Sequence, residues 1–161
     1  MATDSTRRLH HAIPPWVAGG AIIHIRIRVD SEWARHQSLV AREVARRLLD
    51  SVANYHRRGS WYCHLFLLMP DHTHALIAFP SDRPMSQVIS AWKSWHARHT
   101  AIAWQDNYFD HRIRNDAEFE LKATYIRHNP IVKGLCQRAE DWPWVVDANS
   151  LAAPSGTPAP T

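Results

Sequence analysis

Residues 61–79 have the sequence WYCHLFLLMPDHTHALIAF, and the rest of the predicted fold is built outward from them. Residues 61–69 are mostly apolar on both faces, which is typical of a strand in the middle of a sheet. Pro70 and Asp71 break the apolar run, and residues 72–79 resume it as a second strand. This part of the chain therefore predicts a hairpin of two buried strands.

Residues 22–29, upstream of the hairpin, alternate between apolar and polar side chains. Isoleucine or valine occupies the odd positions from 23 to 29, whereas the even positions carry His24, Arg26 and Arg28. Because successive side chains of a strand point to opposite faces, this pattern predicts a half-buried strand with a basic outer face.

Helices are predicted by apolar periodicity and by capping residues over residues 35–55, residues 84–95 and residues 116–128. We expect Asp116 to cap the third helix and Asn129-Pro130 to end it. Residues 102–113 predict a strand plus a loop. The order β-α-β-β-α-β-α then predicts an α+β fold: an antiparallel sheet with packed helices, of ferredoxin-like or RNA-recognition-like build.

The 161 residues fit one domain with loose ends. We expect a flexible N-terminal arm over residues 1–15, an ordered domain over residues 16–146, and a flexible C-terminal tail over residues 147–161, which is rich in Ala, Pro, Ser, Gly and Thr. No apolar run resembles a signal peptide or approaches the length of a membrane span. Cys63 and Cys136 form no paired motif. We therefore expect a soluble, cytoplasmic protein.

The chain is basic, with 19 Lys and Arg against 15 Asp and Glu and a pI near 9.4. Each basic side chain alone is most simply a solvated surface charge. Together, several of them are candidates for a groove that follows a DNA backbone. These DNA-binding candidates are Arg26, Arg28, Lys93, Arg112 and Arg127, with Arg98 and Arg114 nearby.

His72 and His74 stand two residues apart on a predicted strand, so both imidazoles project from the same face. Two such imidazoles can share one divalent metal ion if a third ligand comes from elsewhere. In a chain with 12 histidines, the pair also arises easily without a metal.

Tyr125 and Asn129 lie four residues apart, which places them on one face of the third predicted helix. If that face meets the histidines, Asn129 supplies an oxygen ligand and Tyr125 stands beside the metal. A nearby cation would stabilise the phenolate, whose phenol has a reference pKa of about 10, for attack on a phosphate. The simpler alternative is a packed tyrosine and a helix-end asparagine.

The sequence Met-Pro-Asp-His-Thr-His at 69–74 resembles the metal motif of the HUH endonuclease superfamily. Residues 104–111 (WQDNYFDH), 125–135 (YIRHNPIVKGL) and 140–144 (EDWPW) resemble the later blocks of the REP-associated tyrosine transposases. That family is related to the single-tyrosine transposases of insertion sequences. The blocks occur in the family's order, and the resemblance covers roughly residues 16–146, which it identifies as a catalytic domain with an HUH transposase fold.

The resemblance implies that His72, His74 and Asn129 hold Mg²⁺ or Mn²⁺ and that Tyr125 attacks single-stranded DNA. It implies a covalent 5′-phosphotyrosine intermediate and a free 3′-hydroxyl, which allows the strand to be rejoined. The implied substrates are single-stranded DNAs with hairpins, such as repetitive extragenic palindromes. Relatives act as monomers or homodimers, and a protein with this substrate is expected at the nucleoid.

Two residues depart from the family's motif. Thr73 replaces the usual hydrophobic residue between the histidines, and we expect it to face the other side of the sheet at a cost in packing. Asp71 stands where the family often has asparagine. It could support a ligating histidine, but we favour a role in the turn.

Two other functions remain open on the sequence. The same fold could bind hairpin DNA or RNA without cutting it, or a His-x-His metal site could activate water for hydrolysis. Retention of His72, His74, Tyr125 and Asn129 together argues against simple binding. Hydrolysis by water needs no tyrosine, so replacement of Tyr125 by phenylalanine separates it from the favoured chemistry.

Overall fold

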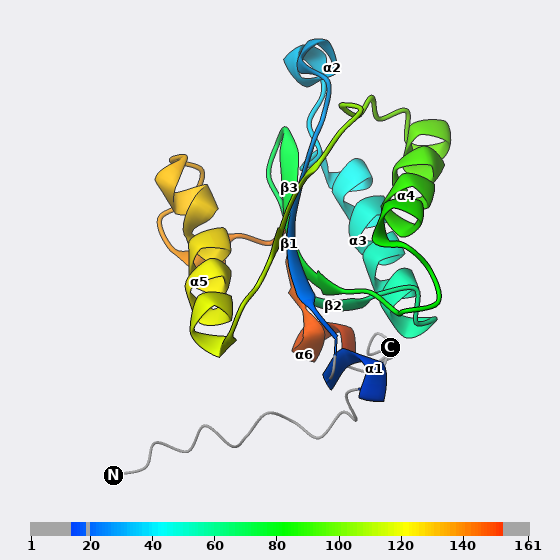
Figure 1. The fold of residues 1–161 in the computed structure, drawn as a ribbon. Coiled ribbons are helices and arrows are strands. Elements are labelled where there is room, and N and C mark those ends of the chain that lie inside the picture. Colours follow the sequence, from blue (N-terminus) through cyan, green and yellow to red (C-terminus); the bar gives the residue numbers. More distant parts are fainter. Residues whose placement is uncertain (1–13, 19, 153–161) are drawn as a thin grey trace, which may run out of the picture.

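A computed structural model of the chain describes residues 14–18 and 20–152, and Figure 1 shows its layers. The elements are α1 (Pro15–Ala18), β1 (Ile22–Arg28), α2 (Ser31–His36), α3 (Arg42–Arg57), β2 (Tyr62–Leu68), β3 (His72–Ala78), α4 (Met85–His99), β4 (Phe109–Arg112), α5 (Asp116–Val132), the 3₁₀ turn η1 (Ala139–Asp141), β5 (Val145–Asp147) and α6 (Ala148–Ala152).

The five strands form one antiparallel sheet in the order β4-β1-β3-β2-β5. Helices α3 and α4 cover one face and α5 covers the other (Figure 1). All seven residues of β3 are buried, because this strand has a neighbour on each side and helices over both faces. The predicted antiparallel sheet with packed helices and its central hairpin are therefore confirmed.

The alternating residues of β1 separate two hydrophobic cores. Ile25 and Ile27 point into the larger core with α3 and α4, where they meet Leu48 and Trp92. The smaller core lies under α5 and contains residues of β2 and β3 with Ile126. Since the even-numbered positions of β1 point toward α5, this side of the sheet is where its polar side chains gather.

The predicted helix over residues 35–55 is wrong as one element, because the chain forms two helices there. Asp30 caps α2 by accepting hydrogen bonds from the backbone N–H groups of Glu32 and Trp33. The helix stops at Gln37, whose backbone is extended (φ −140°, ψ 164°). Leu39 N–H then donates to the carbonyl of Pro70 in the β2–β3 turn, so a tertiary contact interrupts the apolar periodicity.

Helix α5 also differs from the prediction at both ends. Asn115 rather than Asp116 is its cap, since the Asn115 side chain accepts from the N–H of Glu118. Pro130 lies inside the helix, which continues to Val132 and ends where Gly134 adopts a positive φ of 71°. A proline in a helix removes one intrahelical hydrogen bond and its ring crowds the carbonyl four residues earlier, so the helix continues past Pro130 at a cost. Glycine adopts the left-handed conformation without a steric penalty.

Ordered structure reaches further along the chain than the expected boundary at residue 146. Residues 145–147 form the edge strand β5, and residues 148–152 form α6, whose Leu151 is buried. The expected arm over residues 1–15 and the rest of the expected tail lie largely outside the described residues. Within the described part, no helix combines the length and apolar character that a membrane crossing requires.

Candidate active site

Four side chains from β1 and β3 gather on the face of the sheet beneath α5. The strand register places Arg26 opposite His74 and Arg28 opposite His72. Residues directly opposite in an antiparallel pair point to the same face, so the two arginines flank the two histidines. The shared orientation of His72 and His74, predicted from their spacing, follows from this arrangement.

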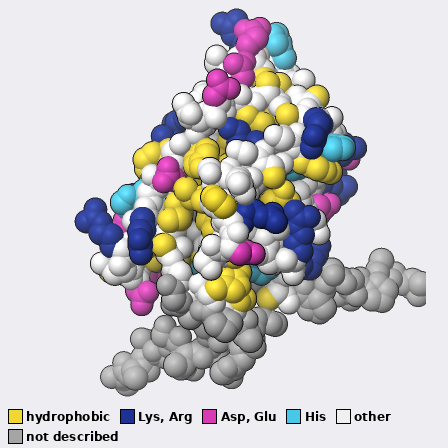
Figure 2. Space-filling model, turned by 45° about the vertical axis from the view of Figure 1, so that its right-hand side comes forward, with side chains coloured by type: hydrophobic (Ala, Val, Ile, Leu, Met, Phe, Trp, Pro, Cys, Tyr) yellow, Lys and Arg dark blue, Asp and Glu magenta, His cyan; other side chains and the backbone are white. Residues whose placement is uncertain are grey.

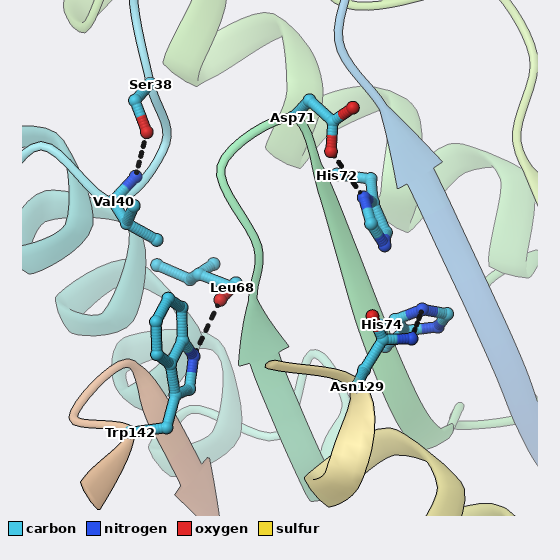
Figure 3. Close-up of polar contacts among 8 residues, drawn as sticks. All are labelled: Ser38, Val40, Leu68, Asp71, His72, His74, Asn129 and Trp142. Atoms are coloured by element: carbon cyan, nitrogen blue, oxygen red, sulfur yellow. Dashed lines mark hydrogen bonds and ion pairs between the residues drawn. The ribbon is translucent and has the colours of Figure 1, made fainter. Parts of the chain in front are cut away.

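The two imidazoles are buried and close together. His72 is 6% exposed and His74 is 1% exposed, and their ring centroids lie 4.9 Å apart. His72 Nδ1 donates to the carboxylate of Asp71 at 2.7 Å, which fixes its tautomer and leaves Nε2 with a free lone pair. Asp71 lies in the turn between β2 and β3, the role that we favoured, and its side chain also holds a histidine of the candidate site (Figure 3).

Asn129 meets this histidine pair from α5. Its side-chain amide lies 3.2 Å from His74 Nε2, and Figure 3 shows it reaching toward that ring. Its Oδ1 atom is buried without a hydrogen-bond partner among the described residues. The amide oxygen and nitrogen can exchange places by a half-turn of the side chain, so an oxygen is available to face His74.

These residues fit a divalent metal ion. Adjacent ligands of an octahedral ion with bonds near 2.1 Å lie about 3 Å apart, which matches the separation of the Asn129 amide from His74. Imidazole nitrogen and amide oxygen are both suitable donors for Mg²⁺ or Mn²⁺. In the described ranges, no three His, Cys, Asp or Glu side chains are grouped to hold a metal.

Tyr125 lies one helical turn before Asn129 and beside the same histidine. Its ring is edge-on to His74, with the centroids 5.9 Å apart. The residue is 53% exposed, so its phenol is open to a ligand approaching from solvent. The structure thus brings together the four residues that the sequence suggested for the chemistry: His72, His74, Tyr125 and Asn129.

Sequence reasoning missed His24, which is buried (4% exposed) in the same cluster. Its Nε2 lies 3.1 Å from His74 Nδ1, and the two rings stack with centroids 5.4 Å apart. A metal on His74 Nε2 would leave the proton on Nδ1, which then donates to His24. The only sequence signal was an apparently outward-facing histidine on β1, and its pairing depends on the register with β3.

Burial keeps these imidazoles neutral. It lowers the pKa of His74 to about 3 and that of His24 to about 4, and nearby positive charges act in the same direction. Burial also lowers the pKa of His72, despite the opposing effect of its hydrogen bond to the Asp71 carboxylate. Neutral imidazole is the form that binds metal ions, so at neutral pH these side chains are in the protonation state that metal binding requires.

The predicted DNA-binding residues do not form one groove. Arg26, which lies over the Phe109 ring at 5.1 Å, and Arg28 flank the histidines. Arg127 on α5 instead forms an ion pair with Asp147 at 2.7 Å.

Lys93 and Arg112 belong to the opposite face of the sheet. Lys93 lies on α4 and donates to the backbone carbonyls of Gln105 and Asp106. Arg112 pairs across the strands with Ile23, which packs against the core under α3 and α4. The expectation that these residues share a groove with Arg26 and Arg28 is therefore wrong, because sequence order does not reveal which face a residue reaches.

Comparison with known proteins agrees with this geometry. The family described as "Transposase IS200 like" matches residues 23–129, a range that contains the whole cluster. A REP-associated tyrosine transposase of Escherichia coli (strain K12) is 28% identical over 103 residues. That match covers 60% of this chain and 61% of the relative, so it spans about three fifths of the relative's length.

A solved structure described as a REP-associated tyrosine transposase bound to a REP hairpin has the same fold. It superposes with a TM-score of 0.70 at 20% identity and covers 83% of this chain and 81% of that chain. The resemblance to these transposases and the fold expected from it are confirmed. Since the family match extends over more than half of the residues, this chain belongs to the family of IS200-like transposases.

Proposed function

We propose that the protein cuts and rejoins single-stranded hairpin DNA through Tyr125, with Mg²⁺ or Mn²⁺ held by His72, His74 and Asn129. The observation that carries the proposal is the convergence of these four side chains from β3 and α5. The REP hairpin in the structurally similar transposase supports a hairpin substrate. DNA as substrate would bring the protein to the nucleoid.

In the proposed reaction, the Tyr125 oxygen attacks a phosphorus atom of the strand. The P–O3′ bond breaks as the bond from the phenol oxygen to phosphorus forms. The phenol loses a proton and the departing 3′ oxygen gains one, so charge and atoms balance. The products are a 5′-phosphotyrosine and a 3′-hydroxyl, which can attack in reverse and restore the strand without another energy source.

Side chains around the candidate site would bind the metal, contact the DNA phosphates and orient the two imidazoles for this reaction. Bound at His72, His74 and Asn129, the metal would supply Lewis-acid stabilisation of charge on the phosphate and the phenolate. Arg26 and Arg28 lie beside the histidines and offer guanidinium groups to the phosphates on either side. Asp71 and His24 orient the two imidazoles, so little rearrangement is needed during the reaction.

The proposal is tested with a labelled single-stranded hairpin and Mn²⁺. We expect a denaturation-resistant adduct that peptide mapping locates on Tyr125. Tyr125→Phe should form no adduct while its hairpin affinity stays unchanged, because the phenol oxygen contributes to chemistry rather than to the fold. His74→Ala should also form none.

The same assay distinguishes the proposed tyrosine chemistry from simple DNA binding and from hydrolysis by water. Hairpin binding without an adduct in the unaltered protein would make it a binding module of the same fold. Strand cutting that survives Tyr125→Phe would indicate water as the nucleophile and overturn the proposal.

A further inference from the structure

A hollow of about 500 Å³ lies between α3 and α4, on the opposite face of the sheet from His72 and His74. We call it the α3–α4 groove; its lining includes Arg47, Tyr55, Arg58, Trp95 and His99. The proposed chemistry uses none of these residues. Its size falls within the range of small-ligand sites.

Trp95 leaves an aromatic surface open in this groove. The side chain is 42% exposed, although indole is among the side chains that gain most from burial. Its ring stacks on His99, with centroids 4.3 Å apart and planes 19° from parallel. Arg47 donates to the carbonyl of His99 at 3.0 Å and thereby connects α3 to this stack. The indole is thus held in a fixed position while remaining accessible.

The helices around the groove carry an excess of positive charge. Residues 42–58 and 85–99 contain seven Lys or Arg against two Asp or Glu, a net charge of +5 with His neutral. The whole chain carries only +4. Figure 2, which turns the α4 side of the molecule forward, shows basic side chains interspersed with hydrophobic ones.

Within the groove, Arg58 is placed for a second kind of contact. Its guanidinium lies over the Tyr55 ring at 4.2 Å, which orders an otherwise mobile side chain. Arg47 and Arg58 therefore stand near an exposed indole with their charges accessible, and Asp50 is the acidic side chain in the lining.

We propose that the α3–α4 groove binds an unpaired nucleotide of a DNA or RNA single strand, with the base on Trp95 and a phosphate on Arg47 or Arg58. Stacking on aromatic rings beside a basic groove is how proteins hold single strands without reading sequence. An acidic peptide would satisfy the arginines but would present no flat ring to Trp95. The site is separate from Tyr125 and does not depend on the proposed cleavage.

Binding of a labelled oligothymidylate of about ten nucleotides, followed by fluorescence anisotropy, tests this proposal. We expect Trp95→Ala to weaken binding by about 5- to 150-fold, since stacking contributes about 1–3 kcal/mol per base. Trp95→Phe should retain most of the affinity, because a phenyl ring still stacks. The Arg47→Ala/Arg58→Ala variant should reduce the slope of log affinity against log salt by about 0.7, as expected for one lost phosphate contact on a single strand.

Arg35→Ala and Arg138→Ala are the matched controls, since each removes an exposed arginine away from the groove. Both should bind the strand as the unaltered protein does. Photocrosslinking with 4-thiothymidine should attach the strand to peptides that contain Trp95 or Tyr55. Tyr125→Phe, which lies outside the groove, should bind the oligothymidylate as the unaltered protein does even though it forms no adduct, which separates this proposal from the proposed function.

The groove assignment is overturned if Trp95→Ala, folded by circular dichroism, binds within twofold of the Arg35→Ala control. It is also overturned if crosslinks map only to the Arg26–Arg28 face. Binding of polyglutamate with the same dependence on Trp95 would instead assign the groove to an acidic protein partner.

Discussion

Thr73 separates the two site histidines and points away from them. It is 1% exposed, and its hydroxyl oxygen has no hydrogen-bond partner within the described part of the chain. A buried hydroxyl that makes no hydrogen bond costs free energy, because it has given up water without replacement. The expected cost at this position stays a prediction, which the unpaired hydroxyl supports, and the residue pairs with Ile27 and Leu68 of the core under α3 and α4.

Thr73→Val should raise the free energy of unfolding by about 1 kcal/mol, since it removes the unpaired hydroxyl and keeps the shape. Urea denaturation measures the change, and adduct formation by Tyr125 should persist because residue 73 faces the other core. Thr100→Val is the control: its hydroxyl donates to the His96 carbonyl, so the same substitution should destabilise. Destabilisation by both changes would contradict the prediction.

His24 contacts His74 and would act on the proposed metal site through that imidazole, so its effect should appear in metal affinity. His24→Ala removes the acceptor for His74 Nδ1, and loss of such a partner typically weakens metal binding by about 10- to 100-fold. Electron paramagnetic resonance of free Mn²⁺ measures this without DNA. His24→Gln, which restores an acceptor oxygen, should recover much of the affinity; equal Mn²⁺ affinity in all three proteins would refute the role.

Helices α3 and α4 are joined by a buried polar contact as well as by their apolar faces. His96 on α4 is fully buried, and its Nε2 lies 2.7 Å from the hydroxyl of Ser51 on α3. That hydroxyl donates to the Leu48 carbonyl and accepts from the Trp92 indole N–H. The imidazole must then donate its Nε2 proton to Ser51. The hydrogen bonds that join Ser51 on α3 to His96 and Trp92 on α4 form only while the two helices stay at this distance.

Burial lowers the pKa of His96 to about 4, with a smaller contribution from His99. The unfolded chain, with a pKa near 6.5, then binds the proton more readily than the folded chain. The contribution of neutral His96 to the free energy of unfolding is therefore fully present above about pH 6.5. It is lost as the pH falls toward 4, by up to about 3 kcal/mol. Urea denaturation at pH 7 and pH 5 should show the loss, and His96→Gln should reduce it; an unchanged pH dependence would contradict this.

On the scale of the whole protein, the sheet separates two surfaces with different charge and chemistry. The α5 side holds the His–Asn–Tyr cluster with Arg26 and Arg28 beside it. The α3–α4 side contains the larger core and most of the helical positive charge. If hairpin DNA binds at the cluster as proposed, the effect of a charged residue on that binding should depend on the face of the sheet that the residue occupies.

Two double variants that each remove two charges test this difference. Arg26→Ala/Arg28→Ala should lower the salt slope of hairpin binding by about 1.4, as expected for two lost phosphate contacts on a single strand. Lys93→Ala/Arg112→Ala should change it less, because these side chains lie across the sheet. Anisotropy titrations over a range of salt concentrations give both slopes, and equal slopes would contradict the assignment of the site to the α5 face.

The sequence alone was sufficient to predict the structural features that depend on residues close together in the chain. Alternation along β1 and the buried hairpin of β2 and β3 arise because the pleat turns every second side chain to the same face. The spacing of Tyr125 and Asn129 follows likewise from the helical repeat. The family motifs then suggested which of these residues belong together.

Contacts between distant residues were decided only by the three-dimensional arrangement. His24 meets His74 through the register of two strands, and the break before α3 depends on the bond from Leu39 to Pro70. The face reached by Lys93 depends on how α4 packs on the sheet. β1 and β3 are far apart in the sequence, so their register and the packing of α4 depend on how whole surfaces fit together rather than on one short stretch of the chain.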